Sequence, residues 1–263
     1  MDVADYLSAL GVPAMPPRSS PFDPGYDPGT LEGHLAQSAH LMAELKISMA
    51  CWLIADEGAT RRKVAAARAH GVPAVTGGGP FEIAVAQGVL PDYLDLCADV
   101  GMSKIECGRG FTDMPLAPDE VVGLARERDL AVEVELGGKH TGAFDAAQVE
   151  ELITEGRAWL DAGAERLVVE ARESAHDVGL FDDHGGLDTA LADRFAEAFG
   201  LDIVIFEAPS KWSQFRLLDH FGAGVRLSNV RLEELLRVEI YRRGLHSDAF
   251  GNPTLRPAAR TRR

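Results

Sequence analysis

The chain has 263 residues, of which 46% are hydrophobic and 25% charged, so it can bury a large core and is not a disordered segment. Its net charge of −15, from 26 basic and 41 acidic side chains, argues against nucleic acid as its main partner, because no excess of Lys and Arg exists to displace counterions. Three cysteines without a C-x-x-C pair, an acidic N-terminus and no apolar run of membrane-spanning length predict a cytoplasmic protein with reduced thiols and no membrane partner.

The predicted elements begin with an irregular segment over residues 1–29, because the turn signal Asp-Pro-Gly occurs twice, at Asp23 and Asp27. Within this segment we expect a short helix over 3–10 and a weak first strand around 18–22. Further strands are predicted over 45–49, 72–75, 104–107, 131–136, 166–170, 202–207 and 224–227. Helices are predicted over 31–44, 59–70, 92–99, 118–128, 145–162, 187–199 and 229–243, with two more opening at 81–82 and within 208–214.

This alternation of strand and helix predicts a single (β/α)8 barrel over residues 30–251. Strand starts recur about every 22 to 36 residues, close to the ~30 expected when a ~250-residue barrel is divided by eight. Mostly apolar strands that alternate with helices imply a parallel sheet. A doubly wound open sheet is the alternative, but no G-x-G-x-x-G or P-loop follows an early strand. Residues 252–263 are expected to form a basic, flexible tail.

Three successive predicted strands end in a glutamate, namely Glu135, Glu170 and Glu207. In a (β/α)8 barrel the carboxyl ends of the strands carry the active site, so these side chains are expected on one rim. Carboxylate oxygens suit Mg²⁺, and the three glutamates are therefore predicted metal ligands. The alternative is a network of ion pairs with nearby basic side chains such as Lys139, Arg172 and Lys211.

Two lysines are candidate catalytic residues. Lys139 follows the strand 131–136 after a break at Gly137 and Gly138, which leaves it free to reach over the rim. If desolvated or placed near other cations, its pKa would fall and it could exchange protons near neutral pH. Lys46 lies within an earlier predicted strand. A Schiff-base aldolase that uses Lys46 or Lys139 is a further alternative, and its imine would be trapped by borohydride.

The remaining rim residues are predicted to bind an anionic substrate. A Gly77-Gly-Gly-Pro80 turn before a helix offers backbone N–H groups to an anion, although a plain tight turn would need no ligand. Basic and polar side chains near other strand ends can contact phosphate or carboxylate groups. The full set of predicted substrate-binding residues is Gly78, Gly79, Arg109, Arg172, Ser174, Lys211, Gln214 and Asn229.

Several of these segments also occur together in one known family. They are Val75-Thr-Gly-Gly-Gly-Pro-Phe-Glu82, Glu133-Val-Glu-Leu-Gly-Gly-Lys139, Val168-Val-Glu-Ala-Arg-Glu-Ser174, Val204-Ile-Phe-Glu-Ala-Pro-Ser-Lys211 and Glu239-Ile-Tyr-Arg-Arg-Gly-Leu-His-Ser-Asp-Ala-Phe-Gly251. In these motifs, spread over about residues 46–251, the chain resembles the phosphosulfolactate synthase (ComA) family, which includes plant heat-stress-associated relatives.

The resemblance implies a (β/α)8 barrel, expected to be a homo-oligomer, that adds sulfite to C3 of phosphoenolpyruvate with Mg²⁺ and gives (2R)-2-phospho-3-sulfolactate. An ene-diolate forms on the way, which acids holding a metal would stabilise. Lys139 stands at the family's matching lysine and would protonate C2. A catalytically inactive, stress-associated barrel that binds protein partners is the alternative from a different class.

The chain departs from the family's pattern at three rim segments. The family's Asp-Lys-Gly-Leu after the first strand is here Asp23-Pro-Gly-Tyr26, without the lysine. The family's Lys-Phe-Gly-Trp-Gly-Thr is here Lys46-Ile-Ser-Met-Ala-Cys51, and its Ser-Asp-Gly after Glu106 is Gly108-Arg-Gly110. These changes leave open a divergent paralogue that adds another nucleophile to an enol phosphate or a related acid.

Overall fold

A computed structural model describes residues 1–12 and 14–255 of the protein. Eight parallel strands form a closed barrel in which each strand pairs with its neighbours in chain order. The register of β1 against β8 places Phe22 opposite Arg231, and this pairing closes the barrel. The strands are β1 (Ser19–Asp23), β2 (Leu45–Ile47), β3 (Ala74–Thr76), β4 (Lys104–Cys107), β5 (Ala131–Leu136), β6 (Arg166–Val169), β7 (Val204–Glu207) and β8 (Arg226–Arg231). The predicted (β/α)8 fold is confirmed.

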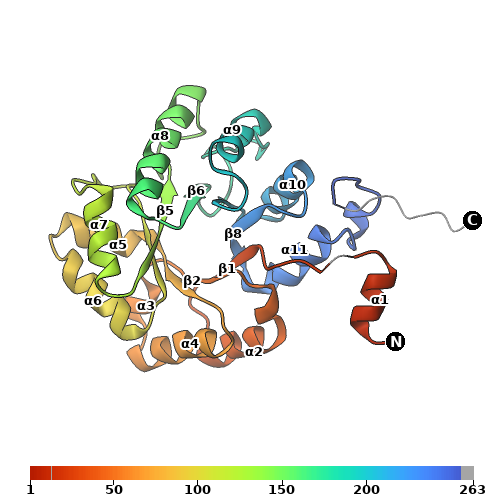
Figure 1. The fold of residues 1–263 in the computed structure, drawn as a ribbon, viewed down its shortest axis with the longest axis horizontal. Helices are drawn as coiled ribbons and strands as arrows, with labels where there is room; N and C mark the ends of the chain where they lie inside the picture. The colour runs from red at the N-terminus through yellow and green to blue at the C-terminus, as the bar shows by residue number, and fades with distance from the viewer. Residues whose placement is uncertain (13, 256–263) are drawn as a thin grey trace, which may run out of the picture.

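Helices surround this barrel (Figure 1). They are α2 (Pro28–Ser38), α3 (Cys51–Ile54), α4 (Glu57–Ala69), α5 (Gly78–Ala86), α6 (Leu90–Val100), α7 (Pro118–Arg126), α8 (Ala146–Ala162), α9 (Thr189–Phe199), α10 (Lys211–Phe221) and α11 (Leu235–Arg242), with 3₁₀ turns at Ala39–Leu41, Leu232–Glu234 and Ser247–Ala249. Helix α1 (Val3–Ala9) precedes the barrel and buries none of its residues. Over residues 1–12 and 14–255, no helix is long and apolar enough to cross a lipid bilayer.

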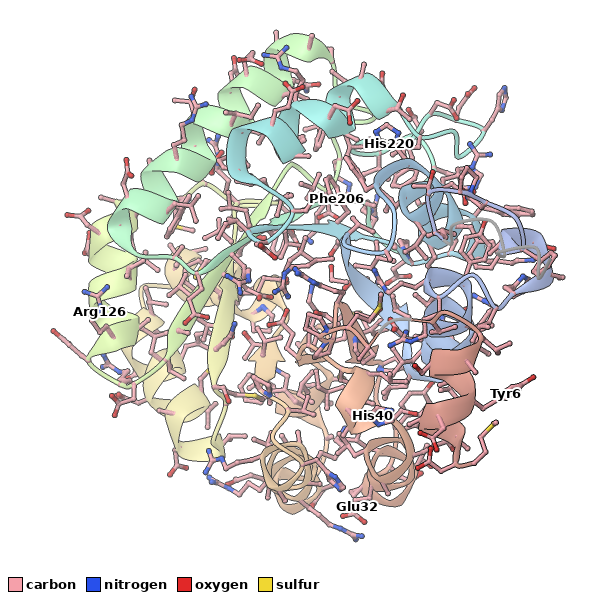
Figure 2. All side chains as sticks on the ribbon, turned by 45° about the vertical axis from the view of Figure 1, so that its right-hand side comes forward. Tyr6, Glu32, His40, Arg126, Phe206 and His220 are labelled. Carbon is pink, nitrogen blue, oxygen red and sulfur yellow. The ribbon has the colours of Figure 1, made fainter. Side chains whose placement is uncertain are left out.

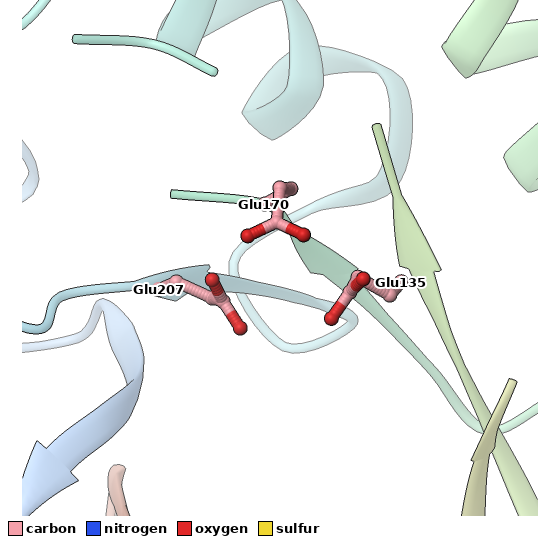
Figure 3. A group of neighbouring side chains, drawn as sticks. All are labelled: Glu135, Glu170 and Glu207. Atoms are coloured by element: carbon pink, nitrogen blue, oxygen red, sulfur yellow. The ribbon is translucent and has the colours of Figure 1, made fainter. Parts of the chain in front are cut away.

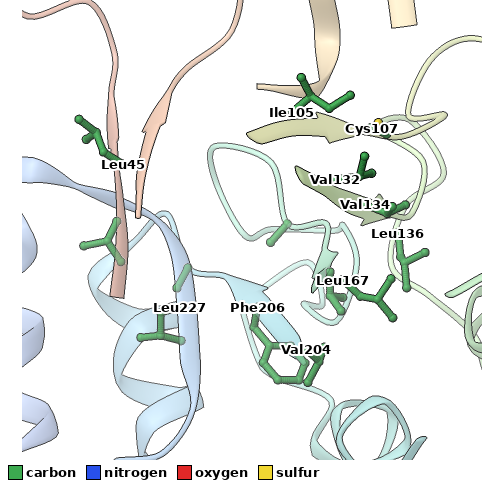
Figure 4. Packing of buried hydrophobic residues seen from close by; sticks show 14 of the residues in the cluster. Leu45, Ile105, Cys107, Val132, Val134, Leu136, Leu167, Val204, Phe206 and Leu227 are labelled. Carbon is green, nitrogen blue, oxygen red and sulfur yellow. The ribbon is translucent and has the colours of Figure 1, made fainter. Parts of the chain in front are cut away.

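The core lies between the strands and the helices (Figure 4). Side chains of β5 alternate between the two faces of the sheet, so Val132, Val134 and Leu136 pack outward against helices. The intervening Glu133 and Glu135 therefore face the barrel interior, where both are buried. Charged residues of the outer helices, such as Glu32 and Arg126, point away from the barrel, whereas Phe206 is buried in the core between the strands and the helices (Figure 2).

Two differences between the predicted and observed element boundaries bear on the site. The first strand expected around 18–22 is present as β1, but because β1 pairs with both β2 and β8, the barrel begins at residue 19 rather than 30. The last strand extends through Asn229 to Arg231, which had been assigned to a helix over 229–243. Pairing with β1 keeps Val230 and Arg231 in the strand, and a propensity argument does not include that partner strand. Of the predicted tail, residues 256–263 lie outside the described residues.

Candidate active site

A cavity of about 740 Å³ opens at the carboxyl ends of the strands. Residues from every part of the barrel rim line it, as expected for a (β/α)8 enzyme. It brings together ten of the residues predicted from the sequence, which are Lys46, Gly78, Gly79, Glu135, Lys139, Glu170, Arg172, Ser174, Glu207 and Asn229.

The three predicted metal ligands converge on the floor of this cavity (Figure 3). One carboxylate oxygen from each of Glu135, Glu170 and Glu207 lies within 4.8 Å of the other two. All three side chains are buried. Glu135 and Glu207 are inward-facing residues near the ends of β5 and β7, and Glu170 directly follows β6. The fold therefore places the three carboxylates together by strand register alone.

Two lysines balance part of this negative charge. Lys139 Nζ lies 2.8 Å from Glu135 Oε1 and 3.0 Å from Glu170 Oε2, so it bridges two of the three acids. Lys46 Nζ lies 2.5 Å from Glu106 Oε2 and 3.6 Å from Glu207 Oε1. Four buried carboxyl groups thus face two ammonium groups, so the floor holds two more acids than cations.

Burial and these charges set the protonation of the cluster. Burial and the neighbouring carboxylates raise the pKa of Glu135 well above its usual range and that of Glu207 to about 8. Burial also acts to raise the pKa of Glu170, but the Lys139 ammonium and hydrogen bonds with the neighbouring side chains together outweigh it and lower this pKa to about 2. The lowered pKa expected for Lys139 is wrong: burial acts to lower it, but Glu135 and Glu170 outweigh burial and raise it. Lys139 is therefore a charged hydrogen-bond donor at neutral pH.

Backbone and amide groups orient two of the glutamates. The Ala171 N–H donates to Glu207 Oε2 at 2.9 Å, and the Arg172 N–H donates to Glu170 Oε1 at 2.6 Å. The Asn229 side-chain amide donates to Glu207 Oε1 at 2.5 Å. Arg172 and Asn229 adopt left-handed backbone conformations, with φ of 55° and 54°. Such conformations are costly for residues other than glycine and concentrate at functional sites, and here they turn the chain so that its donors reach the acids.

Glycines allow close approach around Lys139 and between two rim loops. A Cβ atom on Gly110 would lie 2.9 Å from both Lys139 Cγ and Cε, so the lysine side chain lies directly against this glycine. The Lys139 N–H also donates to the Gly110 carbonyl at 2.8 Å. A Cβ atom on Gly77 would lie 2.8 Å from the Met49 backbone nitrogen. The Gly78 N–H donates to Glu106 Oε1 at 2.9 Å, so this amide is already occupied by a protein anion.

Three residues predicted to bind substrate lie away from the cavity. The Arg109 guanidinium pairs with Glu155 on α8, with Nη2 2.7 Å from Glu155 Oε2. Lys211 Nζ lies above the rings of Trp212 and Phe215, 5.1 Å from each ring centroid. The buried Gln214 amide donates to the Ala208 carbonyl and to Glu234. The replacement of a family acid by Arg109 consequently adds no charge to the cavity.

Three charged cavity residues were missing from the predicted set, namely Glu106, Glu173 and Arg231. Glu106 lies near the end of the predicted strand 104–107, and that position could have identified it as a rim residue. Arg231 had been assigned to a helix, and its position follows from the register of β8 against β1. A further residue outside the predicted set, Glu82, holds the neighbouring loop: its Oε2 accepts hydrogen bonds from the Phe111 and Thr112 backbone amides.

The donor set fits a hard divalent cation. Three buried carboxylates offer oxygens within 4.8 Å of one another, in surroundings with more acids than cations. Mg²⁺ is bound by oxygen ligands and keeps several waters, for which the adjoining cavity has space. Glu135, Glu170 and Glu207 are the residues that would hold it.

Solved structures that are similar in shape share the barrel alone with this chain. A deoxyribose phosphate aldolase from Aeropyrum pernix superposes with a TM-score of 0.56 at 15% identity, covering 92% of this chain and 99% of that one. A putative phosphonomutase from Burkholderia cenocepacia gives a TM-score of 0.53 at 14% identity, covering 85% and 90%. At these identities the comparison establishes the fold without transferring an activity.

Sequence comparison is more specific. The phosphosulfolactate synthase of Methanocaldococcus jannaschii is 29% identical over 230 residues, which cover 87% of this chain and 92% of that protein. The corresponding protein of Methanothermobacter thermautotrophicus is 25% identical over 265 residues, covering 97% of this chain and all of that protein. The family profile described as (2R)-phospho-3-sulfolactate synthase (ComA) matches residues 19–248, which include every strand of the barrel. The chain therefore belongs to the (2R)-phospho-3-sulfolactate synthase (ComA) family.

Proposed function

We propose that this protein is a phosphosulfolactate synthase, a lyase that adds sulfite to C3 of phosphoenolpyruvate and forms (2R)-2-phospho-3-sulfolactate with Mg²⁺. Membership of the family supports the reaction class, and relatives that span most of the chain carry that name. The observation that carries the proposal is the bridge of Lys139 between Glu135 and Glu170, at the floor of an otherwise open cavity.

The proposed chemistry forms one C–S bond and one C–H bond. The sulfur lone pair of sulfite attacks C3, the C2–C3 π electrons move toward C2 and the carboxylate, and a proton is added at C2. Lys139 is the proposed proton donor, because its Nζ is charged and is held at the cavity by two carboxylates. Lys46 is buried between Glu106 and Glu207, and we assign it the role of keeping those two acids in place.

Glu135, Glu170 and Glu207 would hold Mg²⁺, which supplies positive charge where negative charge develops on the substrate carboxylate. The protein's own contribution at this point is orientation, because the Ala171 and Arg172 amides fix two of the carboxylates before any ligand binds. Preorganised charges of this kind need no rearrangement during the reaction. The rim above them carries Arg172 and Ser174, which are the proposed contacts for substrate oxyanions.

A ³¹P NMR assay of the purified protein with phosphoenolpyruvate, sulfite and Mg²⁺ tests this proposal. We expect a new phosphate-ester signal that requires all three components and is lost in the Lys139→Met variant. A signal that forms with another nucleophile, and not with sulfite, would favour the divergent-paralogue alternative. If phosphoenolpyruvate stays unchanged with every nucleophile tried, the proposed reaction is wrong.

A further inference from the structure

The basic side chains of the cavity divide into two groups. Four of them line it among the described residues: Lys46, Lys139, Arg172 and Arg231. The two lysines lie on the floor and are each bridged by two glutamates. The two arginines lie at the rim, at the ends of β6 and β8, and neither has a carboxylate as close as those of the lysines. The two arginines are therefore the cavity cations that can bind a substrate anion.

Arg231 is positioned by an aromatic ring, and its guanidinium can still bind a ligand. Its guanidinium carbon lies 5.9 Å from the centroid of the Phe22 ring, which also lines the cavity. Glu233 is the carboxylate nearest to it in the described part of the chain, at 3.8 Å from Nη1. That carboxylate already accepts a hydrogen bond from the Tyr26 hydroxyl. The donor fork of Arg231, whose side chain is 52% exposed, thus remains free for a ligand.

The neighbouring strand β1 supplies no cation of its own to this side of the cavity. The strand ends at Asp23, before Pro24 and Gly25, and Pro24 lines the cavity at the position where the ComA family pattern has a lysine. Asp23 is buried and paired with Lys63 at 2.5 Å, away from the cavity. Because Arg231 stands opposite Phe22 in the register of β8 against β1, it is adjacent to the position that lacks the lysine.

We infer that Arg231, held by Phe22, forms an oxyanion subsite at the β1–β8 side of the cavity and binds the phosphate group of the substrate. This inference rests on the proposed function for the identity of the substrate. A guanidinium fork matches phosphate oxygens in a bidentate manner. The half-exposed rim also suits a phosphate dianion better than the floor does, because the floor already holds an excess of buried carboxylates. Arg231 then replaces, from strand β8, the cation absent from strand β1.

The test compares four proteins by isothermal titration in the presence of Mg²⁺ and without sulfite, so that no turnover occurs. They are the parent, Arg231→Gln, Arg231→Lys and the control Arg62→Gln, which removes the same charge from a side chain that is 60% exposed on α4. The ligands are phosphoenolpyruvate, inorganic phosphate and oxalate, which has carboxylates alone. We expect Arg231→Gln to weaken binding of phosphoenolpyruvate and phosphate about 10-fold or more, with oxalate affected less than about threefold. Arg231→Lys should be intermediate because it keeps the charge and loses the fork.

The inference is overturned if Arg231→Gln binds phosphoenolpyruvate and phosphate as the parent does, or if oxalate alone is weakened. It is also overturned if Arg62→Gln shows the same loss, since the effect would then come from net charge. Turnover with sulfite is measured in parallel. A parent that binds phosphoenolpyruvate without turning it over would refute the proposed function and leave the subsite testable, whereas a parent that binds neither phosphate ligand would refute both.

Discussion

Gly110→Ala is the substitution that most sharply tests how Lys139 is positioned. The added methyl group would lie 2.9 Å from Lys139 Cγ and Cε and 3.2 Å from Glu82 Oε1. Contacts under 3.0 Å are not tolerated, so the lysine side chain must move. Movement lengthens its contacts with Glu135 and Glu170, now 2.8 and 3.0 Å. Loss of one charge-assisted hydrogen bond costs about 1.5–3 kcal/mol, which corresponds to a fall in kcat of roughly 10- to 150-fold if the contact acts in the transition state.

The assay is the initial rate of product formation at saturating phosphoenolpyruvate and sulfite, with thermal melting of the same samples. Gly123→Ala is the matched control, because it adds the same methyl group on α7 where no atom lies within 4 Å. This control should keep the parent's rate, and its stability should rise by about 0.5–1 kcal/mol through helix propensity. A Gly110→Ala protein with a rate within twofold of the parent would refute the claim that Lys139 needs its present position.

Three further predictions concern the metal, the loops and the buried ion pairs. Added Mg²⁺ should raise the melting temperature of the parent, because binding at 100 times the dissociation constant adds about 2.7 kcal/mol to the free energy of unfolding. A Glu170→Gln protein stabilised equally by Mg²⁺ would count against the proposed ligands. Gly77→Ala should lower stability by about 1–3 kcal/mol, because its methyl group would meet the Met49 backbone nitrogen at 2.8 Å, and an unchanged melting curve would contradict this packing. Glu239→Gln should cost about 3 kcal/mol at pH 7, since Glu239 is buried against Arg242, which together with hydrogen bonds from Ser19 and Arg243 outweighs burial and lowers its pKa. This stabilisation is complete above the ordinary glutamate pKa of 4.5 and is lost as pH falls through the lowered pKa of the folded state, so the gap between the parent and variant melting curves should narrow as pH falls below 4.5; a constant gap would be the contrary result.

The barrel was predictable because its signals are local and repeated. Strand–helix alternation runs through the whole chain, and the period-two pattern of β5 separates Val132 and Val134 from Glu133 and Glu135. The carboxylate cluster was predictable for the same reason. Parallel strands of a closed barrel end on one rim, so a glutamate at the end of each of three neighbouring strands has to meet the others.

The parts that sequence reasoning missed depend on pairings between distant segments. Arg109 and Gln214 stand near strand ends, as binding residues do, but Glu155 and Glu234 draw their side chains away from the cavity. Those partners come from other helices, and the spacing along the chain does not reveal them. The same applies to Arg231, which joins the rim because β8 continues along β1.

The pKa of Lys139 shows how a local argument can give the wrong sign. Desolvation lowers the pKa of a lysine, and the sequence contains a glycine break that suggested a mobile, partly buried side chain. In the folded barrel two carboxylates lie within 3.0 Å of its ammonium group, and their attraction exceeds the cost of burial. The direction of the pKa shift was therefore decided by two charged neighbours, Glu135 on β5 and Glu170 directly after β6.

The most direct test of the account is ¹³C NMR of [3-¹³C]phosphoenolpyruvate with sulfite and Mg²⁺ in D₂O. We predict that the labelled vinyl carbon becomes a methylene carbon bonded to sulfur, with one deuteron at C2 of the same product, and that Lys139→Met forms none of it. Unchanged phosphoenolpyruvate in a sample whose melting temperature shows that this ligand is bound would contradict the assignment of sulfite addition to this site.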